Sequence, residues 1–198
     1  MPKQVDREER RRHIAAALLR IITTRGLEGA GLRDVAAEAG VSMGAVQHYF
    51  ATKDEMLRFA IEYNHELLTA RFARLFAGDR MPTTVRELLG RLLVELLPLD
   101  EQSRDGARMG AAILARGAVD PSVRDVVTMV YEGATGFLAQ QLRLGQERGE
   151  LPADLDPDHA ARALHTVVEG LRWPVLFGVY READALAVLD EHLDRLFG

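Results

Sequence analysis

The sequence predicts an all-α protein with a small N-terminal helix-turn-helix domain and a larger C-terminal helical bundle, about nine helices in all. Nearly every long segment carries apolar residues at helical spacing, and no segment alternates as a strand would. Helix caps and stops recur between these segments. With 198 residues, of which 47% are hydrophobic, the chain is long enough to bury a real core.

The composition narrows the class of protein. The absence of cysteine excludes disulfides, thiolate zinc sites and cysteine nucleophiles. No apolar run reaches the roughly 18 residues of a membrane span. The charged start, "MPKQVDREERRR", lacks the apolar segment of a secretory signal. We therefore expect a cytoplasmic protein that contacts no membrane.

Charge is distributed unevenly along the chain. Residues 1–58 carry ten Lys and Arg against eight Asp and Glu, whereas the rest carries fifteen against twenty-two. A slightly basic N-terminal region suits a polyanionic partner, although such an asymmetry often arises by chance. No nucleophile–base set, phosphate-binding glycine loop or zinc-spaced histidine pair stands out, so we expect no enzyme, metal or cofactor.

The N-terminal elements are defined by clear local signals. Gly26 should end the first helix, and Thr52 with Glu55 three residues later forms a capping box for the fourth. That fourth helix should run to the break at "GDRMP". The first three helices are expected over Asp6–Arg25, Leu32–Ala39 and Met43–Phe50.

The boundaries of the remaining helices are predicted mainly from proline and aspartate residues. Two Asp-Pro pairs place an N-cap before proline at the first helical position, where its missing N–H costs nothing. Pro174 should kink or end its helix near Trp173. The expected helices are Thr83–Leu97, one capped by Asp100 and running to about Gly117, Pro121–Arg148, Pro157–Phe177 and Glu182–Phe197.

The stretch "LRDVAAEAGVSMGAVQHYF" meets the requirements of a helix-turn-helix. Ala36 supplies a small residue where two helices cross, and Gly40 tolerates the positive φ of the turn. The outer face of the third helix would then suit a major groove. Lys53, in the first turn of the next helix, could meet a phosphate. An ordinary three-helix core with a polar face toward water would show the same spacing.

Residues 8–56, and especially "ITTRGLEGAGLRDVAAEAGVSMGAVQHYFATKDEML", resemble the DNA-binding domain of TetR-family transcriptional regulators. The stretches "LLPLDEQSRDGARMGAAILARGAVDP" and "ERGELPADLDPDHAARAL" resemble the regulatory domain of BetI-like members. The resemblance implies a homodimer that binds a near-palindromic operator and is released by a small molecule, more often a repressor than an activator. A helical small-molecule-binding module without operator binding is the alternative.

The resemblance also assigns residues, with residues 1–52 as the DNA-binding domain and 53–198 as the ligand-binding and dimerisation domain. Many members have Ser or Thr where this chain has Gly31, so the cap of the second helix is expected to be weaker. Many also have tyrosine where this chain has Gln47, which could read an adenine edge in place of the usual phosphate contact. The base-facing positions are Met43, Gly44, Ala45, Gln47 and His48, and the phosphate-facing ones are Arg33, Ser42, Tyr49, Thr52 and Lys53.

An effector pocket is expected between helices of the C-terminal bundle. Plain core packing is the commoner role for each candidate, and a satisfied hydrogen bond is the commoner role for His165 with Glu169, which lie one turn apart. BetI-like proteins suggest choline, but aromatic residues make up only 6% of the chain, so choline is not predicted. The candidate lining is Phe59, Tyr63, Leu97, Arg108, Met109, Ile113, Tyr131 and Trp173.

The last two helices carry more apolar surface than one small bundle readily buries. Pairing such faces across a two-fold axis would form a four-helix bundle between subunits. The expected interface is Leu164, Val167, Val168, Leu171, Val175, Phe177, Leu186, Leu189 and Leu193.

Overall fold

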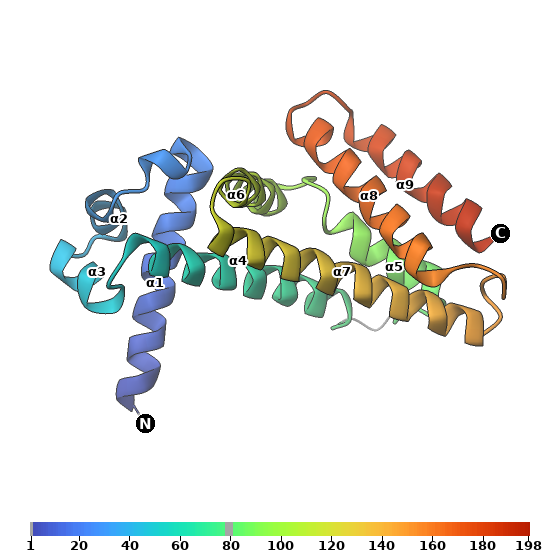
Figure 1. Cartoon of the computed structure of the whole chain (residues 1–198), viewed down its shortest axis with the longest axis horizontal. Coiled ribbons are helices and arrows are strands. Elements are labelled where there is room, and N and C mark those ends of the chain that lie inside the picture. The colour runs from blue at the N-terminus through green and yellow to red at the C-terminus, as the bar shows by residue number, and fades with distance from the viewer. Residues whose placement is uncertain (1, 78–80) are drawn as a thin grey trace. The chain divides into compact units, whose positions relative to one another are not determined.

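A computed structural model describes the backbone of residues 2–77 and 81–198, and the side chains in those ranges from residue 7 onward except residue 28. Within these ranges the chain forms nine α-helices, one short 3-10 helix at Leu27–Gly29 and no strand, which confirms the predicted all-α class (Figure 1). The helices are α1 (Pro2–Arg25), α2 (Leu32–Ala39), α3 (Met43–Tyr49), α4 (Lys53–Leu75), α5 (Val85–Val94), α6 (Glu101–Gly117), α7 (Pro121–Glu147), α8 (Pro157–Leu176) and α9 (Glu182–Phe197).

Helix ends follow the local signals in the sequence. Gly26 and Gly40 have φ of 75° and 65°, values that a residue without a Cβ adopts at little cost. Asp156 caps α8 by accepting hydrogen bonds from the amides of Asp158 and His159 at 3.0 and 3.1 Å. These backbone positions were predictable because each depends on only a few neighbouring residues.

The capping box before α4 forms with a shift of one residue. The Glu55 amide donates to Thr52 Oγ1 at 3.0 Å, as predicted. The Glu55 carboxylate accepts from the amide of Ala51, at 2.8 Å, and thus reaches one residue further back than the usual reciprocal bond to the cap itself. The turn between α3 and α4 is therefore tied to the first turn of α4.

The end of α8 lies within one residue of the predicted Phe177, and Pro174 does not end the helix at Trp173. The helix continues through Pro174 to Leu176 and ends three residues beyond Trp173. Its last turn is closed by the Phe177 amide, which donates to the Trp173 carbonyl at 3.0 Å. Gly178, with φ of 71°, then turns the chain. A proline near a helix end removes only one bond of the ladder, and the bonds that follow it compensate here.

Contacts group the described residues into two compact units. The first comprises residues up to Ala70 with Arg108–Val123, and the second comprises Arg71–Ala107 with Arg124–Gly198. The predicted domain boundary after residue 52 stays a prediction, because a unit defined by contacts need not be a domain that folds alone.

Each unit has its own buried side chains. In the first unit α1 packs against α2, and α2 against α3, around Leu18, Ile21, Val35 and Val46. In the second unit α9 packs against α5 and α8. The second core is built mainly from Leu89, Leu93, Leu142, Leu164, Val168, Leu171, Leu189 and Leu193.

Candidate nucleic-acid interface

The turn between α2 and α3 has the geometry that a helix-turn-helix needs. Ala36 is 4% exposed, so its small side chain lies within the packing of the two helices. The amides of Gly40 and Val41 donate to the carbonyls of Ala37 and Ala36 at 3.2 and 3.0 Å. These bonds satisfy carbonyls at the end of α2 and redirect the chain into α3.

The outer face of α3 is open to solvent in the first unit. Met43, Gly44, Gln47 and His48 are exposed, and Ala45 is half-buried. Val46, on the opposite side of the helix, is completely buried. The helix thus anchors itself through one apolar side chain and presents small, amide and imidazole groups outward. Whether these groups contact bases stays a prediction.

Two hydroxyl groups flank α3 and serve as helix caps. Ser42 Oγ accepts the amide of Ala45 at 3.1 Å, and Thr52 Oγ1 accepts that of Glu55 at 3.0 Å. A hydroxyl that accepts in a cap still has its own hydrogen to donate. Both residues are exposed. They can therefore stabilise their helices and donate to a phosphate at the same time.

The other predicted phosphate-facing residues lie on α2, α3 and α4. Lys53 is exposed at the first residue of α4, and Arg33 is exposed in the first turn of α2. Tyr49 is half-buried, and its ring meets that of His48 edge-on, with 5.1 Å between centroids. A cation beside a helix N-terminus adds its charge to the unpaired amides, which is a favourable arrangement for a phosphate.

The expected weakness at Gly31 is confirmed. Gly31 precedes α2 and offers no side-chain hydrogen bond. The carboxylate of Asp34 lies next to the Gly31 Cα instead, so that a Cβ added at Gly31 would lie 2.7 Å from Asp34 Oδ2. Asp34 thus brings negative charge to the first turn of α2, where the helix dipole favours it.

The long helix α1 holds the helix-turn-helix in ways that sequence reasoning missed. His13 Nε2 lies 2.7 Å from the carbonyl of Ala39, at the end of α2. Arg20 donates through Nε to Glu38 at 2.7 Å. Both partners are more than fifteen residues away in sequence, so no local pattern marks them as supports for the interface.

The candidate pocket residues divide between the two units. Phe59, Tyr63, Arg108, Met109 and Ile113 belong to the first unit, whereas Leu97, Tyr131 and Trp173 belong to the second. Neither unit by itself brings the eight together. Met109 and Leu97 are at most 1% exposed and serve as core residues within their own units.

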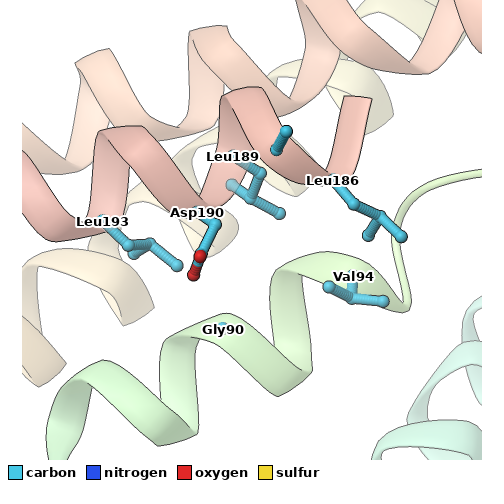
Figure 2. A pocket seen from close by; sticks show the side chains of 7 residues that line it. Gly90, Val94, Leu186, Leu189, Asp190 and Leu193 are labelled. Carbon is cyan, nitrogen blue, oxygen red and sulfur yellow. The ribbon is translucent and has the colours of Figure 1, made fainter. Parts of the chain in front are cut away.

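The second unit contains an open apolar hollow between α5 and α9, with a volume of about 360 Å³ (Figure 2). None of the eight candidate pocket residues lines it. Asp190 adds one carboxylate at its edge and pairs with Arg86 at 2.7 Å. The lining residues are Gly90, Val94, Leu186, Ala187, Leu189, Asp190 and Leu193.

A second hollow, of about 270 Å³, is polar and is crossed by ion pairs. Arg71, which is 9% exposed, lies 2.6 Å from Glu95 and 3.2 Å from Asp100. The Ser103 amide donates to Asp100 Oδ1 at 2.7 Å, and this bond, followed by the bond from the Ser103 hydroxyl and then the charge of Arg71, lowers the pKa of Asp100. The charges are paired with one another, so this hollow is a structural junction between α4 and the start of α6.

Most of the predicted dimer residues are buried in the protomer's own core, which corrects their assignment to an exposed face. α9 packs against both α5 and α8, and this packing covers the apolar seam within one chain. Val167 and Leu186 are half-buried, and Phe177 alone of the nine is widely exposed, at 72%. The buried members are Leu164, Val168, Leu171, Val175, Leu189 and Leu193.

His165 and Glu169 form a polar cluster with α7. Tyr131 Oη donates to Glu169 Oε2 at 3.2 Å, and its ring meets that of His165 at 4.8 Å. Arg172 pairs with Glu169 at 2.6 Å. Burial is the main cause that raises the pKa of Tyr131 and lowers the pKa of His165. Glu169 is thus a satisfied group at a helix interface, the commoner of its two expected roles.

Two further observations concern membranes and metal ions. Among the described residues, no helix is long and apolar enough to cross a membrane. In the same part of the chain, no three His, Cys, Asp or Glu side chains gather as metal ligands would.

Two family models match the chain. The model for bacterial regulatory proteins of the tetR family matches residues 14–59, which include α2, α3 and the start of α4. The model for the C-terminal part of BetI-type transcriptional repressors matches residues 85–198, from α5 to the C-terminus. The two matches follow one another along the chain without overlapping.

Individual relatives agree with this assignment. The HTH-type transcriptional regulator PksA of Bacillus subtilis is 34% identical over 171 residues, covering 86% of this chain and 80% of PksA. A solved transcriptional regulator from Rhodococcus sp. Rha1 has a TM-score of 0.79 at 31% identity and covers 94% of this chain and 95% of its own. A putative regulator from Saccharomonospora viridis, solved in complex with choline, has a TM-score of 0.79 at 29% identity, with 95% of each chain covered.

The helix-turn-helix geometry, the open face of α3 and these likenesses lead to one conclusion. The chain belongs to the TetR family of bacterial regulatory proteins, as a DNA-binding transcriptional regulator with a BetI-type C-terminal region.

Proposed function

We propose that the protein is a repressor that binds a near-palindromic operator as a homodimer and leaves it when a small molecule binds. The observation that carries this proposal is the outer face of α3, where Met43, Gly44, Gln47 and His48 are exposed while Val46 is buried. A helix that exposes such groups beside a helix-turn-helix turn suits the major groove.

Base reading is assigned chiefly to Gln47. Among the exposed side chains of α3, only this amide can pair bidentately with adenine. Met43 and Ala45 supply apolar contact to thymine methyl groups. His48 is the rival reader, with one ring nitrogen to donate or accept, and its ring already packs against Tyr49.

Phosphate contacts are assigned to residues on both sides of α3. Ser42 and Thr52 keep a hydroxyl hydrogen beyond their capping bonds, and Lys53 brings a full charge to the start of α4. Arg33 and Tyr49 complete the set. Such contacts fix the register of the protein on DNA and add affinity that does not depend on sequence.

Dimerisation is proposed through the open surface of α8, α9 and the loop that connects them. Phe177, Val179 and Val188 are exposed there by 72%, 71% and 38%. A dimer must hold its two reading heads about 34–36 Å apart, which is one turn of B-DNA. An effector that changes this separation would release the operator.

The effector is proposed to be a small organic molecule. One relative was solved with choline, and a multidrug-binding relative, EbrR, with imidazole. The eight candidate pocket residues remain the positions to test one by one. Coupling of about 1–3 kcal/mol between effector and operator is typical and must be reciprocal.

The test is footprinting on DNA that flanks the protein's own gene, with and without candidate effectors such as choline. Protection of a near-palindromic site that disappears on adding an effector supports the proposal. The effector should also bind the operator complex more weakly than it binds the free protein, by the same factor by which it weakens operator binding. A reporter behind the protected site separates the roles, because a repressor lowers its expression and an activator raises it. Effector binding without any protected DNA would favour a small-molecule-binding module instead.

A further inference from the structure

Arg11, on α1, lies over two buried phenylalanine rings of the first unit. Its guanidinium carbon is 4.2 Å from the ring centroid of Phe59 and 5.2 Å from that of Phe50. The two rings are 5.5 Å apart, and they are 9% and 0% exposed. A cation over aromatic faces is held by the ring quadrupoles, more strongly where water is excluded.

The Nε atom of Arg11 is buried and has no hydrogen-bond partner. An unsatisfied buried donor is costly, and a long arginine side chain can usually turn its polar atoms to water. Arg11 keeps this costly position, so its contacts with the two rings and with an acidic partner must outweigh the loss. The side chain is therefore held in place by specific contacts.

The acidic partner of Arg11 is Glu55, in the first turn of α4. Arg11 Nη2 lies 3.9 Å from Glu55 Oε1. The other carboxylate oxygen accepts the amide of Ala51 at 2.8 Å, and the Glu55 amide donates to Thr52 Oγ1 at 3.0 Å. Arg11 is thus connected through Glu55 to the whole turn between α3 and α4.

Phe50 brings the same connection to the recognition helix. It caps the C-terminus of α3, with its amide donating to the Val46 carbonyl at 2.9 Å. One arginine from α1 therefore contacts the residue that ends α3, the carboxylate that ties the turn, and a ring on α4. These three points lie on either side of Thr52 and Lys53.

We propose that Arg11 is a positioning residue that fixes the base-facing helix α3 relative to the phosphate-facing start of α4. It does so without touching DNA, through Phe50 and Glu55. This inference rests on the proposed assignment of base contacts to α3 and phosphate contacts to Thr52 and Lys53. Both sets can meet one duplex only when the angle between the two helices is held.

The neighbouring Arg12 offers a matched control on the same helix. Its side chain is 50% exposed and pairs with Glu8 at 3.9 Å and Glu66 at 3.2 Å. Arg11→Met and Arg12→Met remove the same charge and keep a similar apolar stem. They differ in the contact with the two rings and with Glu55.

The first experiment measures amide hydrogen exchange in the full chain without DNA. Arg11→Met should speed exchange at Ala51 and Glu55 by about tenfold, because their hydrogen bonds lose the support of α1. Val35, in the core of α2, should keep its rate, and Arg12→Met should change none of these amides. A uniform rise across α1 to α4 would show that Arg11 only stabilises the domain, and unchanged rates would show that it holds nothing; either result overturns the proposal.

The second experiment measures affinity for the footprinted duplex and for a scrambled duplex of the same length. Arg11→Met should lower the ratio of the two affinities by about tenfold, whereas Arg12→Met should leave the ratio unchanged. Arg11→Lys, which keeps a cation over the rings, should recover part of the ratio. An equal loss on both duplexes beyond that of Arg12→Met would make Arg11 a direct phosphate contact and overturn the proposal, as would a lysine variant no better than the methionine one.

The two experiments separate this inference from the function on which it rests. If no flanking DNA is protected in footprinting, the operator proposal fails, while amide exchange still decides whether Arg11 holds the turn. If a site is protected but exchange at Ala51 and Glu55 does not depend on Arg11, the positioning role fails and the regulator function stands.

Discussion

The outer face of α3 is open to solvent, whereas the apolar seam of α8 and α9 is buried within the protomer. Met43, Gln47 and His48 are exposed, whereas Leu171 and Leu189 are 4% and 2% exposed. The face of a single short helix is set by its own period and by the turn before it. The fate of an apolar seam depends on which distant helix docks on it, and here α9 packs against α5 and α8.

The largest effect should come from a charge inside that seam. Leu189→Asp places a carboxylate among buried leucines and should cost about 3–5 kcal/mol of unfolding free energy. The neighbouring Val188, 38% exposed on the same helix, is the control, and Val188→Asp should change the unfolding free energy of the protomer itself by no more than about 0.5 kcal/mol, apart from any loss of dimer contact. Urea unfolding followed by the single tryptophan, Trp173, measures both, since it lies in the same unit.

The same pair of variants tests the proposed dimer face. Light scattering should find Val188→Asp folded but with a weaker dimer. If Leu189→Asp instead remained as stable as the wild type, the leucine would not be a core residue, and the seam could return to the interface between subunits.

The next effect concerns the exposed face. Gln47→Ala should relax the preference for adenine at one symmetric pair of operator positions, at about 1–3 kcal/mol for each site. Affinity for scrambled DNA should hardly change, and His48→Ala should act less selectively. Binding to a set of operator variants gives the answer. Weakening on every sequence alike would make Gln47 a backbone contact and move base reading to its neighbours.

Features set by neighbouring residues could be predicted from the sequence, whereas features set by distant contacts could not. Gly40, Asp156 and the pair of Thr52 with Glu55 were identified because each acts within a few residues of itself. The end of α8 was predicted to within one residue, but sequence alone did not show that the helix runs on past Pro174 instead of ending at Trp173. Arg11 gave no local sign of its role, because the two rings that it contacts, Phe50 and Phe59, lie far from it along the chain.

A smaller effect should separate affinity from specificity on the same face. Lys53→Ala should weaken binding about equally on all operator variants. It should also reduce the slope of log affinity against log salt concentration by about one for each phosphate that a subunit no longer neutralises. Arg58→Ala removes an equal charge from an exposed position further along α4 and is the control. Titrations at several salt concentrations measure the slope, and an equal change in both variants would show that Lys53 acts only through net charge.

The smallest expected effect is on the pH dependence of stability, tested at one histidine from each region. His165, half-buried beside Tyr131, Glu169 and Arg172, has a pKa lowered mainly by burial, whereas His48 lies exposed on α3. Because the folded state binds this proton more weakly than the unfolded state, stability should fall as the pH drops below the ordinary histidine pKa of about 6.5. His165→Gln removes the titrating group and should reduce the loss of stability between neutral and mildly acidic pH, and the same substitution at the exposed His48 is the control. Urea unfolding at several pH values compares the three proteins. Equal pH dependence in all of them would mean that protonated His165 is accommodated in place, with Glu169 offsetting the desolvation that burial imposes.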